Sequence, residues 1–560
     1  MRIEHVHRHC FTPNFLYPGE TGDVCAHVEL FFIPEEAGSE RMAPKSLALS
    51  ASALVVLGAI SKILGFVREQ AIASSLGAGY LTDSYVLAFS ITGFAFTALN
   101  TILQSAFLPV YSSYRARGNT ESAALFARTM ARVTFGICAV LGLSGSLSAP
   151  LLIRFIAPNS PQETAILASR ITAVLFPAMT SLSLIALFTA VLHSHGSFAL
   201  PGLSPIIQNV VIITALFALT RTMSVWGLVT GMVLGMVIAT LALVPALKNT
   251  PLLSRGSVNL RDESVMAMLR MSGPLFGIAV LAQIYVLVER SLASALLPGS
   301  MAALNFALKV VQLPNAVVVM AICAVVFPRF SEMWGKKDFD SLARTSVSTA
   351  TLVCAIVMPA AIAFGSLATP IVQVVYQRGA FDHAAVSLTA GALRFYSIGI
   401  LFHALALLFT RAFFGMQDSK TPLGVSFVAN GTAVALSFAL VRSMAHTGLA
   451  LANSAGGIVN ALLLGWLLFR KIDGKQTEQF FASVGKILLS SVVMAVVAGV
   501  ALTRFPVTGG NMQSAINFAL VALVAGVTYI ACIFATKVAS AREVVHGISA
   551  FIAKLSKPRP

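Results

Sequence analysis

Residues 72–79 of this 560-residue chain read IASSLGAG, and about 220 residues later residues 292–299 read LASALLPG. A shared offset across several such landmarks indicates an internal duplication. Duplicated hydrophobic halves are typical of transporters in which one half rocks against the other around a central site. The further landmarks are Phe107-Leu108-Pro109 with Val326-Phe327-Pro328, Pro201 with Pro422, Asn209 with Asn430, and Trp226-Gly227-Leu228 with Thr447-Gly448-Leu449.

The composition is that of a membrane protein. Hydrophobic residues make up 57% of the chain and charged residues 11%, whereas a soluble protein carries about 25% charged residues. The mean hydropathy is +0.84, and long apolar runs recur, so we predict an all-α polytopic membrane protein. The net charge of +16 is explained by basic cytoplasmic loops that fix the topology, and we expect no nucleic-acid partner.

About 14 transmembrane helices are predicted from the hydropathy pattern. The repeat groups them into two parallel six-helix lobes around a central cavity, because an even number of spans makes both halves enter the membrane in the same direction. We expect the N-lobe over residues 46–247, a cytoplasmic linker over 248–264, the C-lobe over 265–470, and helices 13 and 14 with a basic cytoplasmic tail over 471–560. The predicted spans are 46–75, 81–111, 121–149, 164–193, 199–219, 223–247, 265–296, 301–328, 343–376, 384–415, 421–441, 445–469, 480–503 and 513–536.

The loop charges predict the orientation. Basic residues gather in the loops on one side of the predicted membrane, and by the positive-inside rule both termini are then cytoplasmic. Residues 1–45 lack the continuous apolar stretch of a secretory signal. We expect residues 1–45 to be a poorly structured extension, or residues 1–41 to lie upstream of a true start at Met42. Loops on the other side carry about one basic residue each, namely Arg154, Arg221, Arg378, Arg442 and Arg504.

Motifs for catalysis are missing from the sequence. It contains no phosphate-binding glycine loop, zinc motif or nucleophile elbow. We therefore predict a transporter without catalytic residues, metal or cofactor, driven by a monovalent cation or by the membrane potential. His5, His7, His9 and Cys10 carry metal-ligating groups, but no second cluster at a ligand spacing accompanies them.

Ionisable residues inside the predicted spans are the candidate site, because a charge in hydrocarbon is costly unless it faces a cavity or a partner. Lys62 and Lys309 have no acidic neighbour within a helical turn, and unpaired cations favour an anionic substrate such as phosphate or pyrophosphate. The full set is Lys62, Arg68 and Glu69 in span 1, Asp83 in span 2, Glu289 and Arg290 in span 7, and Lys309 in span 8.

These charges also have a structural interpretation. They can form ion pairs between helices, or reach the membrane surface from the ends of spans. Asp83 lies near a predicted span end and follows a candidate N-cap at Thr82. Two further motifs are read as turns that set helix geometry: residues 377–382 (QRGAFD) outside the membrane and 416–422 (MQDSKTP) inside it.

Several of these stretches resemble the MurJ/MviN family of lipid II flippases. The resemblance runs from about residue 46 to 470, and the span count agrees with that family. Spans 13 and 14 match only in hydropathy and position. The matching stretches are 61–69 (SKILGFVRE), 76–79 (LGAG), 82–85 (TDSY), 106–109 (AFLP), 304–307 (LNFA), 312–314 (QLP), 378–382 (RGAFD), 411–414 (RAFF) and 417–422 (QDSKTP).

The resemblance implies the multidrug/oligosaccharidyl-lipid/polysaccharide exporter fold, in which two extra helices form a lipid-facing groove. It implies export of lipid-linked peptidoglycan precursor across the bacterial cytoplasmic membrane by alternating access, with membrane lipids and peptidoglycan synthesis proteins as partners. By position, Arg68, Glu69 and Asp83 match family residues, and Arg290 is expected to bind substrate with them. Lys62 and Lys309 stand where the family has arginine, and Glu289 matches an acid of a cation site.

The chain also departs from the family pattern. Residues 91–97 (ITGFAFT) carry no charge, although the family often has a basic residue midway along span 2. Lysine in place of arginine keeps the charge but loses the bidentate fork. Three alternatives therefore remain open: a flippase for another lipid-linked saccharide, a cation-coupled drug antiporter of the same superfamily, and a membrane scaffold without transport.

Overall fold

The described fold consists of helices. The computed structural model describes residues 44–103, 107–248, 263–471 and 477–536, together with residues 250, 252, 257 and 259. The chain divides into residues 1–48, of which 44–48 are helical, and residues 49–560, which hold all other described elements. Residues 1–43 of the expected extension, with the proposed start at Met42, lie outside the described residues, whereas residues 44–45 are helical. Most of the linker and the tail after residue 536 also lie outside the described residues.

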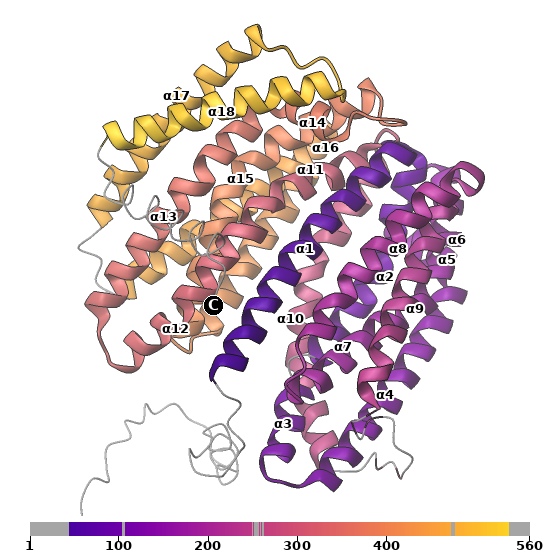
Figure 1. Ribbon diagram of the computed structural model, residues 1–560. Helices are drawn as coiled ribbons and strands as arrows, with labels where there is room; N and C mark the ends of the chain where they lie inside the picture. Colours follow the sequence, from indigo (N-terminus) through magenta and orange to yellow (C-terminus); the bar gives the residue numbers. More distant parts are fainter. Residues whose placement is uncertain are drawn as a thin grey trace, which may run out of the picture. The chain divides into compact units, whose positions relative to one another are not determined.

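Each predicted span coincides with one helix, with part of one, or with up to three consecutive ones (Figure 1). We call the helices α1 to α9 the N-repeat and α10 to α16 the C-repeat. The N-repeat contains α1 (Pro44–Leu76), α2 (Tyr80–Ile102), α3 (Leu108–Ala116), α4 (Thr120–Leu147), α5 (Ala149–Ile156), α6 (Gln162–Ala178), α7 (Thr180–Ser194), α8 (Ala199–Met223) and α9 (Val225–Leu247).

The C-repeat follows the same order, with α15 in the place of α6 and α7 and α16 in the place of α8 and α9, and a pair of helices follows it. That pair, α17 and α18 with their connecting loop, is called the C-terminal hairpin below. The bounds are α10 (Glu263–Ser294), α11 (Ser300–Pro314), the π-helix η4 (Asn315–Val319), α12 (Met320–Gly335), α13 (Phe339–Ser366), α14 (Ala368–Tyr376), α15 (His383–Gly415), α16 (Lys420–Lys471), α17 (Thr477–Arg504) and α18 (Met512–Ala535).

The helices fit a membrane protein. Among the described residues, 10 helices are long and apolar enough to cross a membrane. The helix α16 counts once, although Ala445, with φ 51° and ψ −135°, breaks it between predicted spans 11 and 12. The all-α membrane class is therefore confirmed, whereas the number of 14 spans stays a prediction.

The duplication is visible in the backbone. Ser224, between α8 and α9, has φ 52° and ψ −133°, almost the values of Ala445 in the second copy. Asn119 and Asp338 cap α4 and α13 alike, because each side chain accepts a 3.0 Å hydrogen bond from the amide three residues later. The repeat prediction is thus confirmed in the turns. Further left-handed residues correspond as Gly118 with Lys337 and Gly196 with Gln417.

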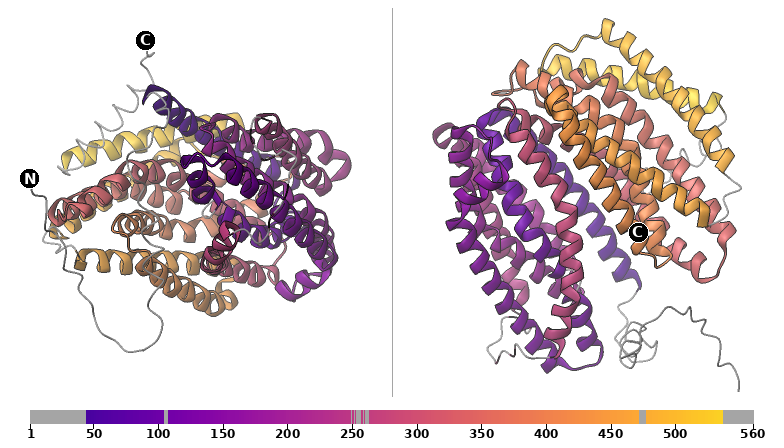
Figure 2. Two further views of the ribbon diagram at one scale, coloured as in Figure 1. Left: turned by 90° about the horizontal axis from the view of Figure 1, so that it is seen from below. Right: turned by 180° about the vertical axis from the view of Figure 1, so that it is seen from behind.

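Apolar side chains cover the outer faces of the helices. Phe155 is 86% exposed and Leu523 64% exposed. In water such exposure would cost about 25 cal/mol per Å², whereas lipid tails cover it without that cost. The C-terminal hairpin packs on the C-repeat, where α17 contacts α13 (Figures 1 and 2).

Candidate functional site

The two repeats are joined where α1 ends and α2 begins. Asp83, on α2, is 4% exposed, and its carboxylate accepts hydrogen bonds from the amides of Gly299 at 2.6 Å and Ala302 at 2.7 Å. These amides form the first turn of α11, where an anion satisfies free N–H groups and the helix dipole. We call the contacts of residues 74–83 with residues 297–302 and 375–381 the seal.

The N-cap predicted at Thr82 is wrong. The N-cap of α2 is Gly79, which has no side chain to form a capping hydrogen bond. Thr82 lies inside the helix, and its hydroxyl donates to the carbonyl of Gly77 at 2.7 Å. Asp83 therefore caps a helix of the other repeat rather than its own.

Glycine brings the backbones of the seal into contact. Gly299 has φ +92°, and a Cβ there would overlap the carbonyl oxygen of Ala78. Gly379 has φ +58°, and a Cβ there would overlap the carbonyl oxygen of Ser74. The amide of Ala380 donates to this same Ser74 oxygen at 2.8 Å. Side chains at these two glycines would therefore separate the repeats.

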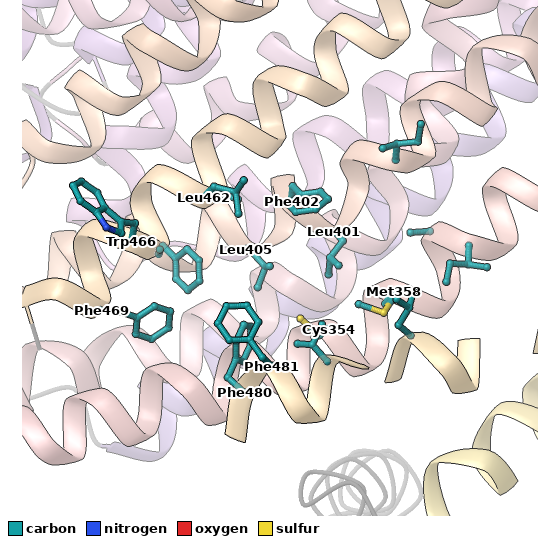
Figure 3. A pocket seen from close by; sticks show the side chains of 18 of the residues that line it. Cys354, Met358, Leu401, Phe402, Leu405, Leu462, Trp466, Phe469, Phe480 and Phe481 are labelled. Carbon is teal, nitrogen blue, oxygen red and sulfur yellow. The ribbon is translucent and has the colours of Figure 1, made fainter. Parts of the chain in front are cut away.

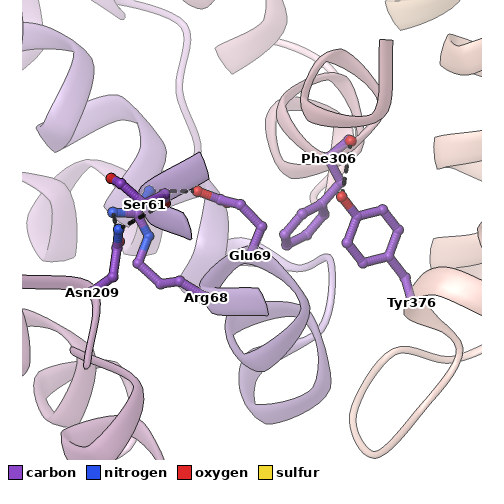
Figure 4. Close-up of polar contacts among 6 residues, drawn as sticks. All are labelled: Ser61, Arg68, Glu69, Asn209, Phe306 and Tyr376. Atoms are coloured by element: carbon purple, nitrogen blue, oxygen red, sulfur yellow. Dashed lines mark hydrogen bonds and ion pairs between the residues drawn. The ribbon is translucent and has the colours of Figure 1, made fainter. Parts of the chain in front are cut away.

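Aromatic rings lie next to the seal. The Tyr376 hydroxyl donates to the carbonyl of Phe306 at 3.2 Å (Figure 4). The Tyr376 ring centroid lies 5.1 Å from that of Phe306, 5.6 Å from that of Phe381 and 6.4 Å from that of Phe66. Phe66 belongs to the N-repeat and the other three to the C-repeat. The cluster therefore adds apolar contacts between the repeats.

Arg68 forms an ion pair with Glu69 on α1 and a hydrogen bond that joins α1 to α8 (Figure 4). Arg68 Nη2 lies 2.8 Å from Glu69 Oε1, with side-chain exposures of 23% and 5%. Arg68 Nη1 donates to Asn209 Oδ1 at 3.1 Å, and Asn209 Nδ2 donates to the Ser61 carbonyl at 3.3 Å. Arg68 is thus neutralised within the N-repeat. Its predicted contact with substrate stays a prediction.

Glu289 and Arg290 are the corresponding pair of the C-repeat. Glu289 accepts a 2.7 Å hydrogen bond from the Tyr396 hydroxyl, and Arg290 Nη2 lies 3.9 Å from its other oxygen. Both residues are buried, and Arg290 Nε and Nη1 have no hydrogen-bond partner among the described residues. No described group of three His, Cys, Asp or Glu side chains is arranged to hold a metal ion. The cation site at Glu289 stays a prediction.

Lys62 and Lys309 differ from Arg68 and Arg290 in having no acidic partner among the described residues. Lys62 is exposed on α1, and Lys309 is half-buried on α11. Neither ammonium forms a salt bridge with any residue that the structure describes. The sequence expectation of unpaired cations therefore agrees with the described contacts, while their binding of substrate stays a prediction.

The uncharged stretch of span 2 contributes to the core. Phe96 is buried, and its ring centroid lies 6.3 Å from that of Phe176 on α6. The Thr92 hydroxyl is buried and donates to the carbonyl of Ala88 at 2.9 Å. A basic side chain at either position would be buried without a counter-charge, which is strongly unfavourable.

Comparison with known proteins identifies the family. The profile of the family described as "Lipid II flippase MurJ" matches residues 72–523. The chain belongs to the MurJ family. The matched range contains Asp83, Glu289, Arg290 and Lys309, whereas Lys62, Arg68 and Glu69 precede it.

MurJ-family relatives are similar along most of their length. A probable lipid II flippase MurJ of Rhizobium tropici is 27% identical over 451 residues, covering 78% of this chain and 83% of the relative. The lipid II flippase MurJ of Burkholderia cenocepacia is 26% identical over 417 residues, covering 72% and 80%.

Solved structures agree on the fold. A lipid II flippase MurJ in an inward closed conformation superposes with a TM-score of 0.71 at 22% identity, covering 85% of this chain and 97% of that one. An inward-facing multidrug transporter of the MATE family superposes with a TM-score of 0.66 at 16% identity, covering 75% and 98%. The two-lobed fold is therefore shared with MurJ and with MATE transporters.

The resemblance to the MurJ family predicted a lipid-facing groove formed by spans 13 and 14. The structure has an apolar groove of about 950 Å³ (Figure 3). Its lining comes from α13, α15, the second half of α16 and α17, and α18 contributes no residue to it. At one end the Arg470 guanidinium lies 5.0 Å from the Trp466 ring centre. This groove is thus lined by α17 together with the C-repeat, and a groove formed by the last two helices stays a prediction.

Some partners in the site were missed by sequence reasoning. Asn209 was noted only as a repeat landmark, although an amide in an apolar span is itself a signal of a polar partner. Tyr396 carries no such signal, because a tyrosine in an apolar span is usually a packing residue. The backbone amides of α11 that bind Asp83 cannot be seen in a sequence.

Proposed function

We propose that this chain moves lipid II, the lipid-linked peptidoglycan precursor, from the inner to the outer leaflet of the bacterial cytoplasmic membrane. The seal carries the proposal, because transport by alternating access requires a contact between duplicated halves that closes one end and can break. Asp83 contributes hydrogen bonds to this contact, beside apolar contacts between the repeats such as that of Phe66 with Tyr376. The family match over residues 72–523 supports lipid II as the substrate.

The orientation follows from the loop charges. With both termini in the cytoplasm, α1 ends at the outer surface, so the seal closes the outer side. We therefore infer an inward-facing state. Flipped lipid II would be delivered to peptidoglycan synthesis proteins at the outer leaflet.

Lys62 and Lys309 are the first contacts that we assign to the diphosphate. Each carries a positive charge without an acidic partner among the described residues. One lysine comes from each repeat, so a diphosphate bound to both would hold the repeats together. The lipid chain would lie in the groove beside α17, where the lining is apolar.

The paired charges have a second role in this proposal. Arg68 and Arg290 would reach the substrate only after their bonds with Glu69 and Glu289 rearrange, so they act during the transition between states. Asp83 acts through the seal. Coupling to a monovalent cation at Glu289, or to the membrane potential, would drive the cycle.

The test replaces the resident flippase of a bacterium with this chain. After depletion of the resident protein, labelled lipid II is assayed for accessibility on the outer leaflet with a membrane-impermeant probe. Restored accessibility and growth are expected. Unchanged accessibility, with the chain present in the membrane and no other flippase active, would remove lipid II as the substrate.

A further inference from the structure

The loop between α14 and α15 contacts two distant parts of the chain. On one side, the amide of Ala380 donates to the carbonyl of Ser74 on α1 at 2.8 Å. On the other side, Arg378 Nε donates to the carbonyl of Gly510, in the loop between α17 and α18, at 3.1 Å. This loop, the QRGAFD motif, therefore contacts both the opposite repeat and the C-terminal hairpin.

The Arg378 guanidinium donates its hydrogen bonds to backbone carbonyl oxygens. Its Nη2 donates to the carbonyl of Val374 in the last turn of α14 at 3.2 Å, where a cation interacts favourably with the helix dipole. The nearby carboxylate of Asp382 accepts instead from the amide of Ala385, at 2.8 Å, and so caps α15. One guanidinium thus connects the end of α14 with the hairpin loop.

Gly510 is the second feature of this contact. A Cβ at Gly510 would overlap the carbonyl oxygen of Gln377 and would lie 3.0 Å from Cγ of Arg378. Any larger residue would push the two loops apart. A guanidinium and a glycine, on different segments, therefore favour the same close approach.

The hairpin forms one wall of the apolar groove. Phe480, Phe481, Val484 and Leu488 of α17 line that groove (Figure 3 labels the two phenylalanines). The Tyr529 hydroxyl on α18 donates to the carbonyl of Ala355 on α13 at 2.5 Å. The hairpin is thus hydrogen-bonded to the C-repeat at two places, Tyr529 and Gly510, and the second lies next to the seal.

We propose that Arg378 is a positioning residue for transport, which keeps the outer loop of the hairpin attached to the C-repeat while the seal opens. Opening must break the bond between Ala380 and Ser74, because these residues belong to different repeats. The hydrogen bond between Arg378 and Gly510 joins the C-repeat to the hairpin packed on it. It therefore stays formed when the two repeats separate. The groove wall then moves together with the C-repeat. The inference that a lipid occupies the groove rests on the proposed function. The contact between the two loops does not depend on that function.

The test compares the full-length Arg378→Ala protein with wild type by hydrogen exchange and by flipping. Loss of a hydrogen bond worth about 1 kcal/mol corresponds to about fivefold faster exchange. We expect that change in residues 505–511, with residues 74–83 unaffected. The lipid II flipping rate is expected to fall by about the same factor at equal protein level. Arg442→Ala removes an exposed arginine predicted on the same membrane side and should change neither quantity.

A second variant disturbs the same loop contact without removing a charged side chain. Gly510→Ala pushes the loops apart and should reproduce both effects, and the double variant should be no worse than either single one. Wild-type exchange in Arg378→Ala, or effects that multiply in the double variant, would overturn the loop contact. Faster exchange with an unchanged flipping rate would overturn its role in transport. If the wild-type protein moves no lipid II, the proposed function fails. The hydrogen exchange of residues 505–511 then still tests whether Arg378 holds the hairpin loop.

Discussion

The carboxylate of Asp83 accepts a hydrogen bond from the amide of Gly299, 216 residues further along the chain. One side chain of the N-repeat therefore completes the first turn of a helix in the C-repeat. Hydrogen bonds to a charged group contribute about 1.5–3 kcal/mol each. An interaction of this size favours the closed seal and remains small enough to break within a transport cycle.

Replacing Asp83 should open the seal. In Asp83→Asn the amide has one acceptor oxygen and no charge, so we expect the closed state to be weakened by about 1.4 kcal/mol, which is a factor of ten. A cysteine introduced at Ala78, in a background without the native cysteines, should react about tenfold faster with a membrane-impermeant thiol reagent. Asp382→Asn, which removes a cap within one repeat, is the control and should leave the reaction unchanged.

Gly299 and Gly79 occupy corresponding places in the two repeats but should respond differently to alanine. Gly299→Ala places a Cβ against the Ala78 carbonyl at φ +92°, and the left-handed conformation alone costs about 1–2 kcal/mol. We expect faster thiol labelling in a reporter placed at Ser75. Gly79 has φ −150° and open space around its Cβ position. Equal labelling of the two alanine variants would contradict the close approach in the seal.

The unpaired lysines should be needed for transport as cations. Lys62→Gln and Lys309→Gln each remove a charge-assisted contact, and we expect flipping to fall about tenfold or more at equal protein level. Lys62→Arg and Lys309→Arg keep the charge and should restore most of the rate. Lys486→Gln, on the exposed surface of α17, is the matched control. Full flipping with both lysines changed to glutamine would exclude them from the substrate site.

Asp418, in the turn between α15 and α16, should make stability depend on acidic pH. Its carboxylate accepts hydrogen bonds from the Thr421 amide and the Lys471 ammonium, each at 3.0 Å. Burial alone would raise the pKa of Asp418, but these bonds outweigh it, so the pKa lies below its usual value. The stabilisation is therefore present above about pH 4 and is lost as the pH falls through the folded-state pKa.

The size of this effect is small, because a partly exposed ion pair contributes less than about 1 kcal/mol. The thermal unfolding temperature of purified wild type should exceed that of Asp418→Asn near neutral pH. The two should converge below about pH 4. A constant difference across that range would show that the loss in the variant comes from packing and not from the charge.

The sequence was sufficient for the helices and the repeat. Apolar run length decides where a helix crosses a bilayer, so all predicted spans coincide with helices. The offset between residues 72–79 and 292–299 correctly predicted two copies of one fold. The copies also share turns that lack a common residue, such as Gly118 and Lys337, which only the backbone angles reveal.

The sequence was insufficient for the partners of the charges. Asp83 was expected near the end of its own helix, but the groups that it binds are backbone amides of α11, which no residue type marks. Arg68 was assigned to a cavity, and its contact with Asn209 depends on the packing of α1 against α8. The family resemblance predicted a groove formed by the last two helices but gave no sign of the groove that α17 lines with the C-repeat, because hydropathy does not show which helices adjoin.

The adjacent-residue pairs Arg68–Glu69 and Glu289–Arg290 have a consequence for electrical work. Moving one elementary charge through a membrane potential involves about 2.3 kcal/mol per 100 mV. A pair of opposite charges that moves as a unit carries no net charge, so the field does almost no work on it. The two pairs can therefore shift with their helices at little electrical cost. A potential that is negative inside would act instead on the single charges of Lys62, Lys309 and Asp83, and would favour the outward movement of a diphosphate.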